Sequence, residues 1–201
     1  MIRRLTLLAG AVALSVVALC SQRAIAQNDR IVKGTVSLPP DSGSVKNVVV
    51  YLEGAIGTPT SVKMTVDQKD MTFIPHVLPV VVGSTLDFVN NDDVMHNVFS
   101  NSATQRFDIG MFPRGESRSV VFDKPGVVEL RCNVHPAMRA FVLVLDNNYF
   151  ATPDERGNYQ INGIPRGRYK LRAWHESLPP IETWANLDDA ALRAIDLQFK
   201  R

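Results

Sequence analysis

The apolar residues of this chain come in runs that are too short for helices and are evenly separated by turn residues. From Ile31 onward, β-branched and aromatic runs such as 48–52 and 141–145 alternate with turn-forming stretches such as 90–93. Short strands punctuated by Pro, Gly, Asn and Asp are typical of β-sandwiches and barrels. We therefore expect an all-β fold, in which residues 188–195 are the only candidate helix.

Residues 1–26 have the pattern of a secretory signal peptide. Two arginines precede the uncharged apolar run 5–19, whose 15 residues are short for a membrane-spanning helix of roughly 20. Small residues at Ala24 and Ala26 predict cleavage after Ala26. The mature chain is thus expected in the periplasm, without a membrane span. Lipidation at Cys20 is the alternative, although a bulky leucine stands before it.

Removal of the signal peptide changes both the charge and the cysteine content. Three of the 22 basic residues lie within it, which leaves 19 against 20 acidic residues. A nearly neutral mature chain has no basic surface that would indicate nucleic-acid binding. Cys132 becomes the only thiol, so an intramolecular disulfide is impossible. In an oxidising compartment, such a thiol should be buried, paired between chains or bound to another group.

The stretch CNVHPAM, residues 132–138, spaces Cys132, His135 and Met138 three residues apart. It lies between two strand-like runs and is therefore expected to be a loop. In a turn-like conformation, residues three apart can face the same way, as they do on a helix. A thiolate, an imidazole and a thioether together suit copper better than zinc, calcium or magnesium, because thioether sulfur selects Cu(I). One more imidazole would complete a trigonal set of two imidazoles and one thiolate, with methionine as a weak axial ligand.

His96 is the candidate for that imidazole, 36 residues before Cys132 and shortly after the strand-like run 86–89. At this point residues 62–145 resemble the cupredoxins, the blue copper proteins of the amicyanin and plastocyanin type. The resemblance rests on the Cys-x₂-His-x₂-Met spacing and on three further stretches, namely 82–85, 96–98 and 122–126.

The resemblance implies a Greek-key β-sandwich over residues 60–145 that binds one type I copper ion. His96 and His135 would bind through ring nitrogen, Cys132 through sulfur, and Met138 from a longer axial distance. Asn97 would join the two ligand loops by hydrogen bonds. The exposed edge of His135 would be the exit for the electron. An apolar shell around the ion is expected to set the reduction potential by excluding water. The residues expected to form this shell are Met95, Phe99, Met111, Phe112 and Phe141.

The resemblance further implies electron transfer between redox partner proteins, and the histidine content argues against an enzyme. The chain has four histidines, so only two would remain after the copper site, too few for a multicopper cluster. His76 is interpreted as a surface histidine between strands, with an extra metal ligand or a metal-loading site as the alternatives. Two alternatives stay open: a protein that stores or delivers copper, and a structural or glycan-binding protein that copper stabilises.

Residues 149–175 resemble the transthyretin-like carboxypeptidase regulatory domain, a small β-sandwich. That domain normally opens with two strands like 33–36 and 47–54, which here precede the copper-binding segment. We therefore expect one sandwich built from 31–56 and 146–201, interrupted by an inserted cupredoxin domain. The alternative is that the early strands extend the cupredoxin sheet. Trp174 and Trp184 are the candidates for contact with a carbohydrate or a partner protein through the second sandwich.

Overall fold

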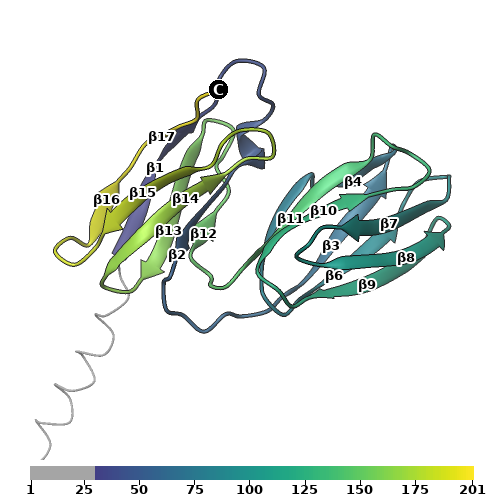
Figure 1. Cartoon of the computed structure of the whole chain (residues 1–201), viewed down its shortest axis with the longest axis horizontal. Helices are drawn as coiled ribbons and strands as arrows, with labels where there is room; N and C mark the ends of the chain where they lie inside the picture. Colours follow the sequence, from purple (N-terminus) through teal and green to yellow (C-terminus); the bar gives the residue numbers. More distant parts are fainter. Residues whose placement is uncertain (1–29) are drawn as a thin grey trace, which may run out of the picture.

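The computed structural model describes residues 30–201, so the predicted signal peptide lies outside the described residues. The regular structure of this part consists of seventeen strands and one 3₁₀ turn, η1 (Val45–Asn47), which confirms the all-β class. The strands form two β-sandwiches that lie side by side (Figure 1). Within residues 30–201, no helix has the length and apolar character needed to cross a membrane.

The middle of the chain forms one of the two β-sandwiches, which we call the central sandwich. One of its sheets has the strand order β5-β11-β10-β7-β8, and the other has the order β4-β3-β6-β9. Its strands are β3 (Lys63–Lys69), β4 (Thr72–Ile74), β5 (Val77–Val81), β6 (Ser84–Asn90), β7 (His96–Asn101), β8 (Arg106–Phe112), β9 (Ser117–Phe122), β10 (Gly126–Arg131) and β11 (Arg139–Leu145).

Strands from both ends of the described chain form the other one, which we call the terminal sandwich. Its sheets have the orders β13-β1-β16, with β17 also on β1, and β12-β2-β14-β15. The early strands therefore pair with late strands and do not extend the central sheets. The strands are β1 (Arg30–Ser37), β2 (Val49–Glu53), β12 (Phe150–Ala151), β13 (Asn158–Ile164), β14 (Arg168–Trp174), β15 (Ile181–Asn186), β16 (Leu192–Ala194) and β17 (Leu197–Gln198).

The expected helix at residues 188–195 is wrong. β16 lies in this segment and runs parallel to β1, with Leu192 opposite Ile31 and Ala194 opposite Lys33. The two-residue strand β17 continues the contact further along β1. The backbone groups of β1 thus find partners on this side as well as on β13, and sheet pairing overrides a weak local helix preference.

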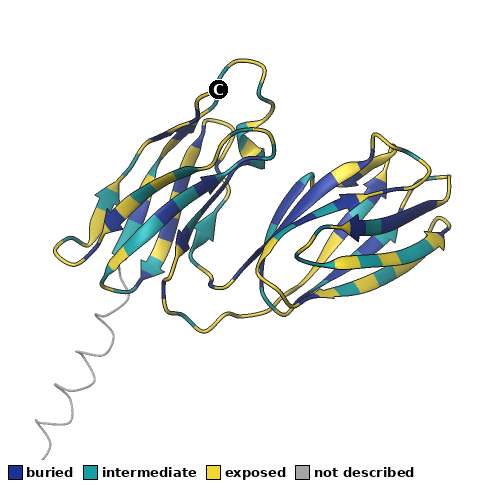
Figure 2. Ribbon diagram, viewed as in Figure 1, coloured by how far each residue is buried: buried dark blue, intermediate teal, exposed yellow. Residues whose placement is uncertain are grey.

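Each sandwich has its own core, because alternate residues of its strands point inward. In β6, for example, Leu86 and Phe88 are buried, while Thr85 before them and Asp87 between them are only partly buried. Buried and more exposed positions alternate along the strands of both sandwiches (Figure 2). The core of the terminal sandwich includes Val32, Leu52, Ile161, Leu171 and Leu187. The central core includes Val66, Phe73, Leu86, Phe88, Val98, Phe112, Phe122, Leu130, Cys132, Met138 and Val142.

Strand β11 is buried on both faces. Its residues Val142 and Val144 belong to the central core. The alternate residues Phe141, Leu143 and Leu145 form a third apolar cluster that includes residues of the terminal sandwich, such as Val49, Phe150 and Trp174. This strand therefore packs into its own sandwich with one face and against the neighbouring sandwich with the other.

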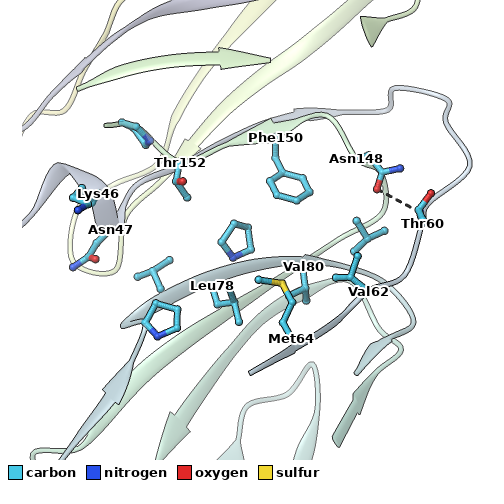
Figure 3. A pocket seen from close by; sticks show the side chains of 15 residues that line it. Lys46, Asn47, Thr60, Val62, Met64, Leu78, Val80, Asn148, Phe150 and Thr152 are labelled. Carbon is cyan, nitrogen blue, oxygen red and sulfur yellow. Dashed lines mark hydrogen bonds between the residues drawn. The ribbon is translucent and has the colours of Figure 1, made fainter. Parts of the chain in front are cut away.

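The two sandwiches touch along a strip and leave a cavity beside it. The cavity has a volume of about 610 Å³ and is lined by residues of both sandwiches (Figure 3). Its lining is largely apolar, with Leu78 and Val80 on the central side and Phe150 on the terminal side. The orientation of the two sandwiches relative to each other thus depends on the apolar contacts of β11 with the terminal sandwich and on a few polar contacts near them.

Candidate metal centre

Adjacent strands bring the two predicted ligand segments to the same end of the central sandwich. His96 is the first residue of β7, and the 132–138 loop connects β10 to β11. β10 lies between β7 and β11 in the sheet, with Arg131 opposite both Phe99 of β7 and Arg139 of β11. The cysteine therefore emerges from the strand that lies next to the one bearing His96.

Three of the four predicted ligands converge. The Sγ atom of Cys132 lies 3.8 Å from Nδ1 of His96 and 4.0 Å from Nδ1 of His135. The two Nδ1 atoms lie 3.0 Å apart. Among the described residues, this is the one group of three histidine, cysteine or acidic side chains whose possible ligand atoms all lie within 4.8 Å of one another.

These separations fit a single small ion between the three atoms. With metal–nitrogen distances of about 2.0 Å and a metal–sulfur distance of about 2.3 Å, a trigonal ion places sulfur about 3.7 Å from each nitrogen. The observed sulfur–nitrogen distances are within a few tenths of an ångström of that value. The two nitrogens, 3.0 Å apart, are closer than the roughly 3.5 Å of a regular trigonal ion, so they fit an ion with a narrower angle of about 97° between its two nitrogens. Two imidazoles and one thiolate in a trigonal arrangement are the strong donors of a type I copper site. The residues present therefore fit the metal that the sequence predicts.

His96 is fully buried and its ring is oriented by a carboxylate. Its Nε2 lies 2.7 Å from Oδ2 of Asp92, four residues earlier in the chain. A ring nitrogen that faces a carboxylate carries the proton, so the lone pair of Nδ1 is left free to bind a metal. Asp92 was missed as a functional residue, because the run 90–93 was interpreted only as a turn.

Asp92 is itself held by the tip of the β3–β4 hairpin. The backbone N–H groups of Asp70 and Met71 donate to its two carboxylate oxygens at 2.8 Å each. Both hairpin residues have positive φ, 53° and 54°, so the tip is specially shaped to present these groups. Burial raises the pKa of Asp92, but the hydrogen bonds from Met71, His96 and Asp70 outweigh it and hold the pKa below its usual value.

The two ligand segments are tied together as predicted for Asn97. The side-chain oxygen of Asn97 accepts a hydrogen bond of 2.7 Å from the backbone N–H of Asn133, the residue after Cys132. Within the loop, the N–H of Met138 donates to the carbonyl of His135 at 2.9 Å. These bonds fix the thiol and the second imidazole relative to His96.

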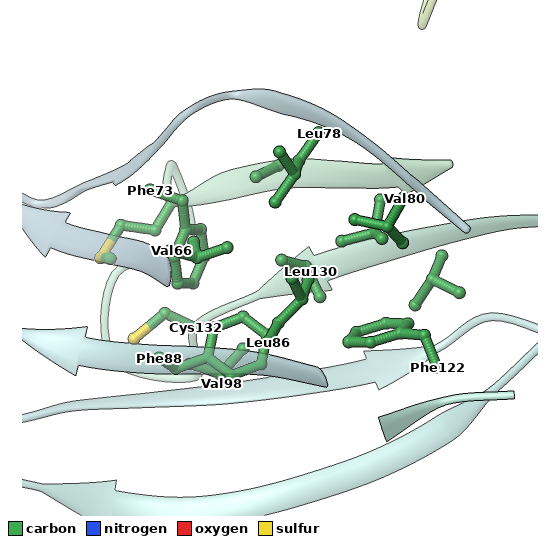
Figure 4. Close-up of a cluster of buried hydrophobic side chains, with 14 of the residues drawn as sticks. Val66, Phe73, Leu78, Val80, Leu86, Phe88, Val98, Phe122, Leu130 and Cys132 are labelled. Atoms are coloured by element: carbon green, nitrogen blue, oxygen red, sulfur yellow. The ribbon is translucent and has the colours of Figure 1, made fainter. Parts of the chain in front are cut away.

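Met138 is 1% exposed and lies in the same buried cluster as Cys132, whose packing is drawn in Figure 4. Of the expected apolar shell, Phe112 also belongs to this cluster. Met95 and Met111 do not exclude water, because they are 48% and 39% exposed. Phe141 lies on the opposite face of β11 and packs against the terminal sandwich. The axial role of Met138 stays a prediction.

His135 is the ligand candidate that reaches the surface. It is only partly buried, and its neighbours Val134, Pro136 and Ala137 are exposed. Val94, in the loop before β7, is exposed as well, at 47%. The site thus combines a buried imidazole, a buried thiol and one imidazole accessible from an apolar surface.

The other residues that the sequence singled out lie elsewhere. His76 is partly buried and bonds to Glu176 of the terminal sandwich at 2.6 Å, so it is not a plain surface residue. Trp174 packs against Phe141 between the sandwiches, with ring centroids 5.3 Å apart. Trp184 is 54% exposed and one face of its ring is covered by Arg168 at 4.4 Å.

Comparison with known proteins agrees with the chemistry of the site. Residues 60–145 match the family of copper binding proteins described as plastocyanin/azurin. The comparison with curated protein sequences gave no match.

Solved structures similar to the chain include several copper proteins. One is a purple cupredoxin from Nitrosopumilus maritimus, with 24% identity, coverage of 41% of this chain and 99% of that chain, and a TM-score of 0.38. Another is amicyanin from Paracoccus versutus, with 23% identity, coverage of 41% and 81%, and a TM-score of 0.39. A third is a copper-containing nitrite reductase from Thermus scotoductus SA-01, with 23% identity, coverage of 56% and 28%, and a TM-score of 0.40.

Proposed function

We propose that this chain, whose residues 60–145 belong to the copper-binding plastocyanin/azurin family, is a periplasmic electron carrier. Its ligands would be His96, Cys132 and His135, with Met138 in the axial position. The observation that carries the proposal is the convergence of two imidazole nitrogens and one sulfur within 4.8 Å. Bound copper would supply one-electron chemistry by alternating between its +1 and +2 states.

The protein's own contribution would be to keep the donors in place during electron transfer. Asp92 orients the ring of His96, and Asn97 ties the cysteine segment to the same strand. Donors that are fixed by such hydrogen bonds move little when the charge of the ion changes, and a small rearrangement permits fast electron transfer. Burial of Cys132 and Met138 in the central core keeps water from the sulfur ligands.

The accessible edge of His135 would be the point where electrons enter and leave. The surrounding exposed apolar residues, Val94, Val134, Pro136 and Ala137, allow a redox partner to approach closely without displacing charged side chains. Neither of the other two histidines joins the three donor atoms among the described residues: His76 bonds to Glu176 and to the carbonyl of Arg139, and His175 lies in the terminal sandwich against Phe199. A carrier that passes electrons between partner proteins therefore fits this chain better than a multicopper enzyme.

A visible spectrum of the copper-loaded protein tests the proposal. We expect an intense absorption band from thiolate-to-copper charge transfer in the oxidised protein, its loss on reduction, and its return in a reversible one-electron titration. A colourless Cu(I) protein that resists oxidation but releases copper to a chelator would contradict electron transfer.

A copper-delivery protein is the second candidate, and exposed thioethers favour it. Met71, Met95 and Met111 are 55%, 48% and 39% exposed. All three belong to segments that hold the site: Met71 bonds Asp92, Met95 precedes His96, and Met111 is opposite Asn97. Thioether sulfur is a ligand for Cu(I). If this candidate is correct, replacing the three by leucine slows copper transfer to a chelator and leaves the reduction potential unchanged.

Glutamine in place of Met138 is expected to keep copper bound and to lower its reduction potential. An amide oxygen is a harder donor than a thioether and stabilises Cu(II) relative to Cu(I). A spectroscopic redox titration of the variant measures the shift. Met111→Gln is the control, because this exposed thioether lies outside the predicted ligand set. Equal potentials for Met138→Gln and the unmodified protein would remove Met138 from the axial position.

A further inference from the structure

A polar cluster joins the two sandwiches next to the candidate ligand loop. Arg139 directly follows Met138 and begins β11, while Glu176 follows β14 of the terminal sandwich. One carboxylate oxygen of Glu176 lies 2.6 Å from Nε2 of His76. Its other oxygen lies 3.7 Å from the guanidinium of Arg139. A single acidic residue of the terminal sandwich therefore contacts both Arg139, the first residue of β11, and His76, which directly precedes the neighbouring strand β5.

His76 connects this carboxylate to the backbone of the ligand loop. Its Nδ1 donates to the carbonyl of Arg139 at 3.0 Å. Its own carbonyl accepts a bond of 2.8 Å from the N–H of Phe141. His76 thus bonds to two alternate residues of β11, with its side chain to Arg139 and with its backbone to Phe141. Glu176 fixes the orientation of the imidazole ring.

The contacts around this cluster are partly shielded from water. The side chains of Glu176 and His76 are 21% and 31% exposed. Arg139 lies over the ring of Phe141, with its guanidinium carbon 4.7 Å from the centroid. Phe141 also packs against Trp174 of the terminal sandwich. The hydrogen bond between the Glu176 carboxylate and His76 is charge-assisted, and in such surroundings it is stronger than an ion pair on an open surface. Arg139 is more exposed, at 41%, and its Nε also lies 2.7 Å from Oε1 of Glu129 in β10, so its link to Glu176 is the weaker of the two.

The ligand loop is therefore anchored at both ends by different parts of the molecule. Its first half is tied to β7 by Asn97, within the central sandwich. Its second half runs through Met138 into the cluster held by the terminal sandwich. Residues that hold metal ligands in place from outside the ligand set strongly affect affinity and redox properties.

We propose that Glu176 is a positioning residue of the copper centre, through which the terminal sandwich holds the end of the ligand loop by way of His76 and Arg139. The proposal rests on the proposed function and adds to it a role for the second sandwich. The terminal sandwich then sets the rigidity of the 132–138 loop and, in the loaded protein, the reduction potential.

Amide hydrogen exchange of the intact, copper-free chain tests the anchoring directly. In Glu176→Ala we expect the amides of Met138 and Phe141 to exchange about tenfold faster, which corresponds to about 1.4 kcal/mol. The amide of Asn133, held at the other end of the loop, should keep its rate. Glu182→Gln is the matched control, a carboxylate of the same sandwich that pairs with Arg172, and it should leave all three rates unchanged. Unchanged exchange of Met138 and Phe141 in Glu176→Ala overturns the proposal.

Reduction potentials of two variants separate positioning from charge. Glu176→Gln and Glu176→Ala remove the same negative charge, but only glutamine keeps an oxygen that can accept a hydrogen bond from His76. Positioning predicts a larger change of potential in Glu176→Ala than in Glu176→Gln, and equal changes contradict it. If the unmodified chain binds no copper, the proposed function fails, while the exchange experiment still decides whether Glu176 holds the loop.

Discussion

Serine in place of Cys132 is expected to abolish the intense visible absorption of the copper-loaded protein completely. The absorption requires a thiolate bound to copper, and Cys132 is the only thiol in the part of the chain that the structure describes. Because serine is close to cysteine in size, the copper-free variant should fold with a stability within about 1–3 kcal/mol of the unmodified protein. Visible spectroscopy after copper addition and thermal unfolding of the copper-free form measure the two effects.

Val134→Ala is the matched control for this experiment. Val134 lies in the same loop and is 50% exposed, so its truncation should leave both the colour and the stability unchanged. A Cys132→Ser variant that is still intensely coloured would show that the thiolate assignment is wrong.

Asparagine in place of Asp92 is expected to weaken copper binding about 10- to 100-fold, the usual effect of removing a residue that orients a metal ligand. The Oδ2 atom of Asp92 accepts from both His96 and Met71. The amide of asparagine places an NH₂ group on one side, so it cannot accept at every position that the carboxylate serves. Titration with a Cu(I) chelator of known affinity measures the loss.

Asp93→Asn provides the control for Asp92. Asp93 is the next residue, its side chain is 86% exposed, and it pairs with Arg114 away from the imidazole. This variant should bind copper as tightly as the unmodified protein. If both variants lose affinity equally, the cause is the charge of the loop and not the orientation of His96.

The part of the site formed by Cys132 and His135 could be predicted from sequence because its information is local. Cys132 and His135 lie within four residues of one loop, and a turn brings such close neighbours to one point. His96 comes from another strand, so its position in the sequence made it only a candidate, and the resemblance to a family assigned it the role of ligand. The all-β class followed equally directly from the short apolar runs, since their length and turn residues reflect the strands themselves.

Asp92 could not be recognised in the same way. An aspartate among asparagines normally indicates a turn, where its side chain bonds the local backbone. Its functional contacts come from His96 on one side and from Asp70 and Met71 on the other. The four-residue spacing to His96 was visible, but the approach of the hairpin tip from a distant part of the sequence was not.

The prediction of the apolar shell was wrong for Met95, Met111 and Phe141, because the direction of each of these side chains depends on tertiary structure. The unbroken apolar run 141–145 predicts a strand that is buried on both faces, yet it does not say what covers each face. In the structure, Phe141 faces the terminal sandwich, so it cannot line the site. Met95 directly precedes His96, and Met111 lies opposite Asn97 in the pairing of β7 with β8, but the side chains of both methionines are exposed to solvent.

The strands of the central sandwich come between two groups of strands of the terminal sandwich along the chain, and this order has a mechanical consequence. Two separate chain segments join the bodies, one between β2 and β3 and the other between β11 and β12 (Figure 1). A module on a single tether can swivel about it, whereas a module fastened at two points retains mainly a rocking motion. For a protein that binds the terminal sandwich, the edge of His135 would therefore lie in a nearly constant direction. Such a partner would need to sample fewer orientations before it reaches that edge.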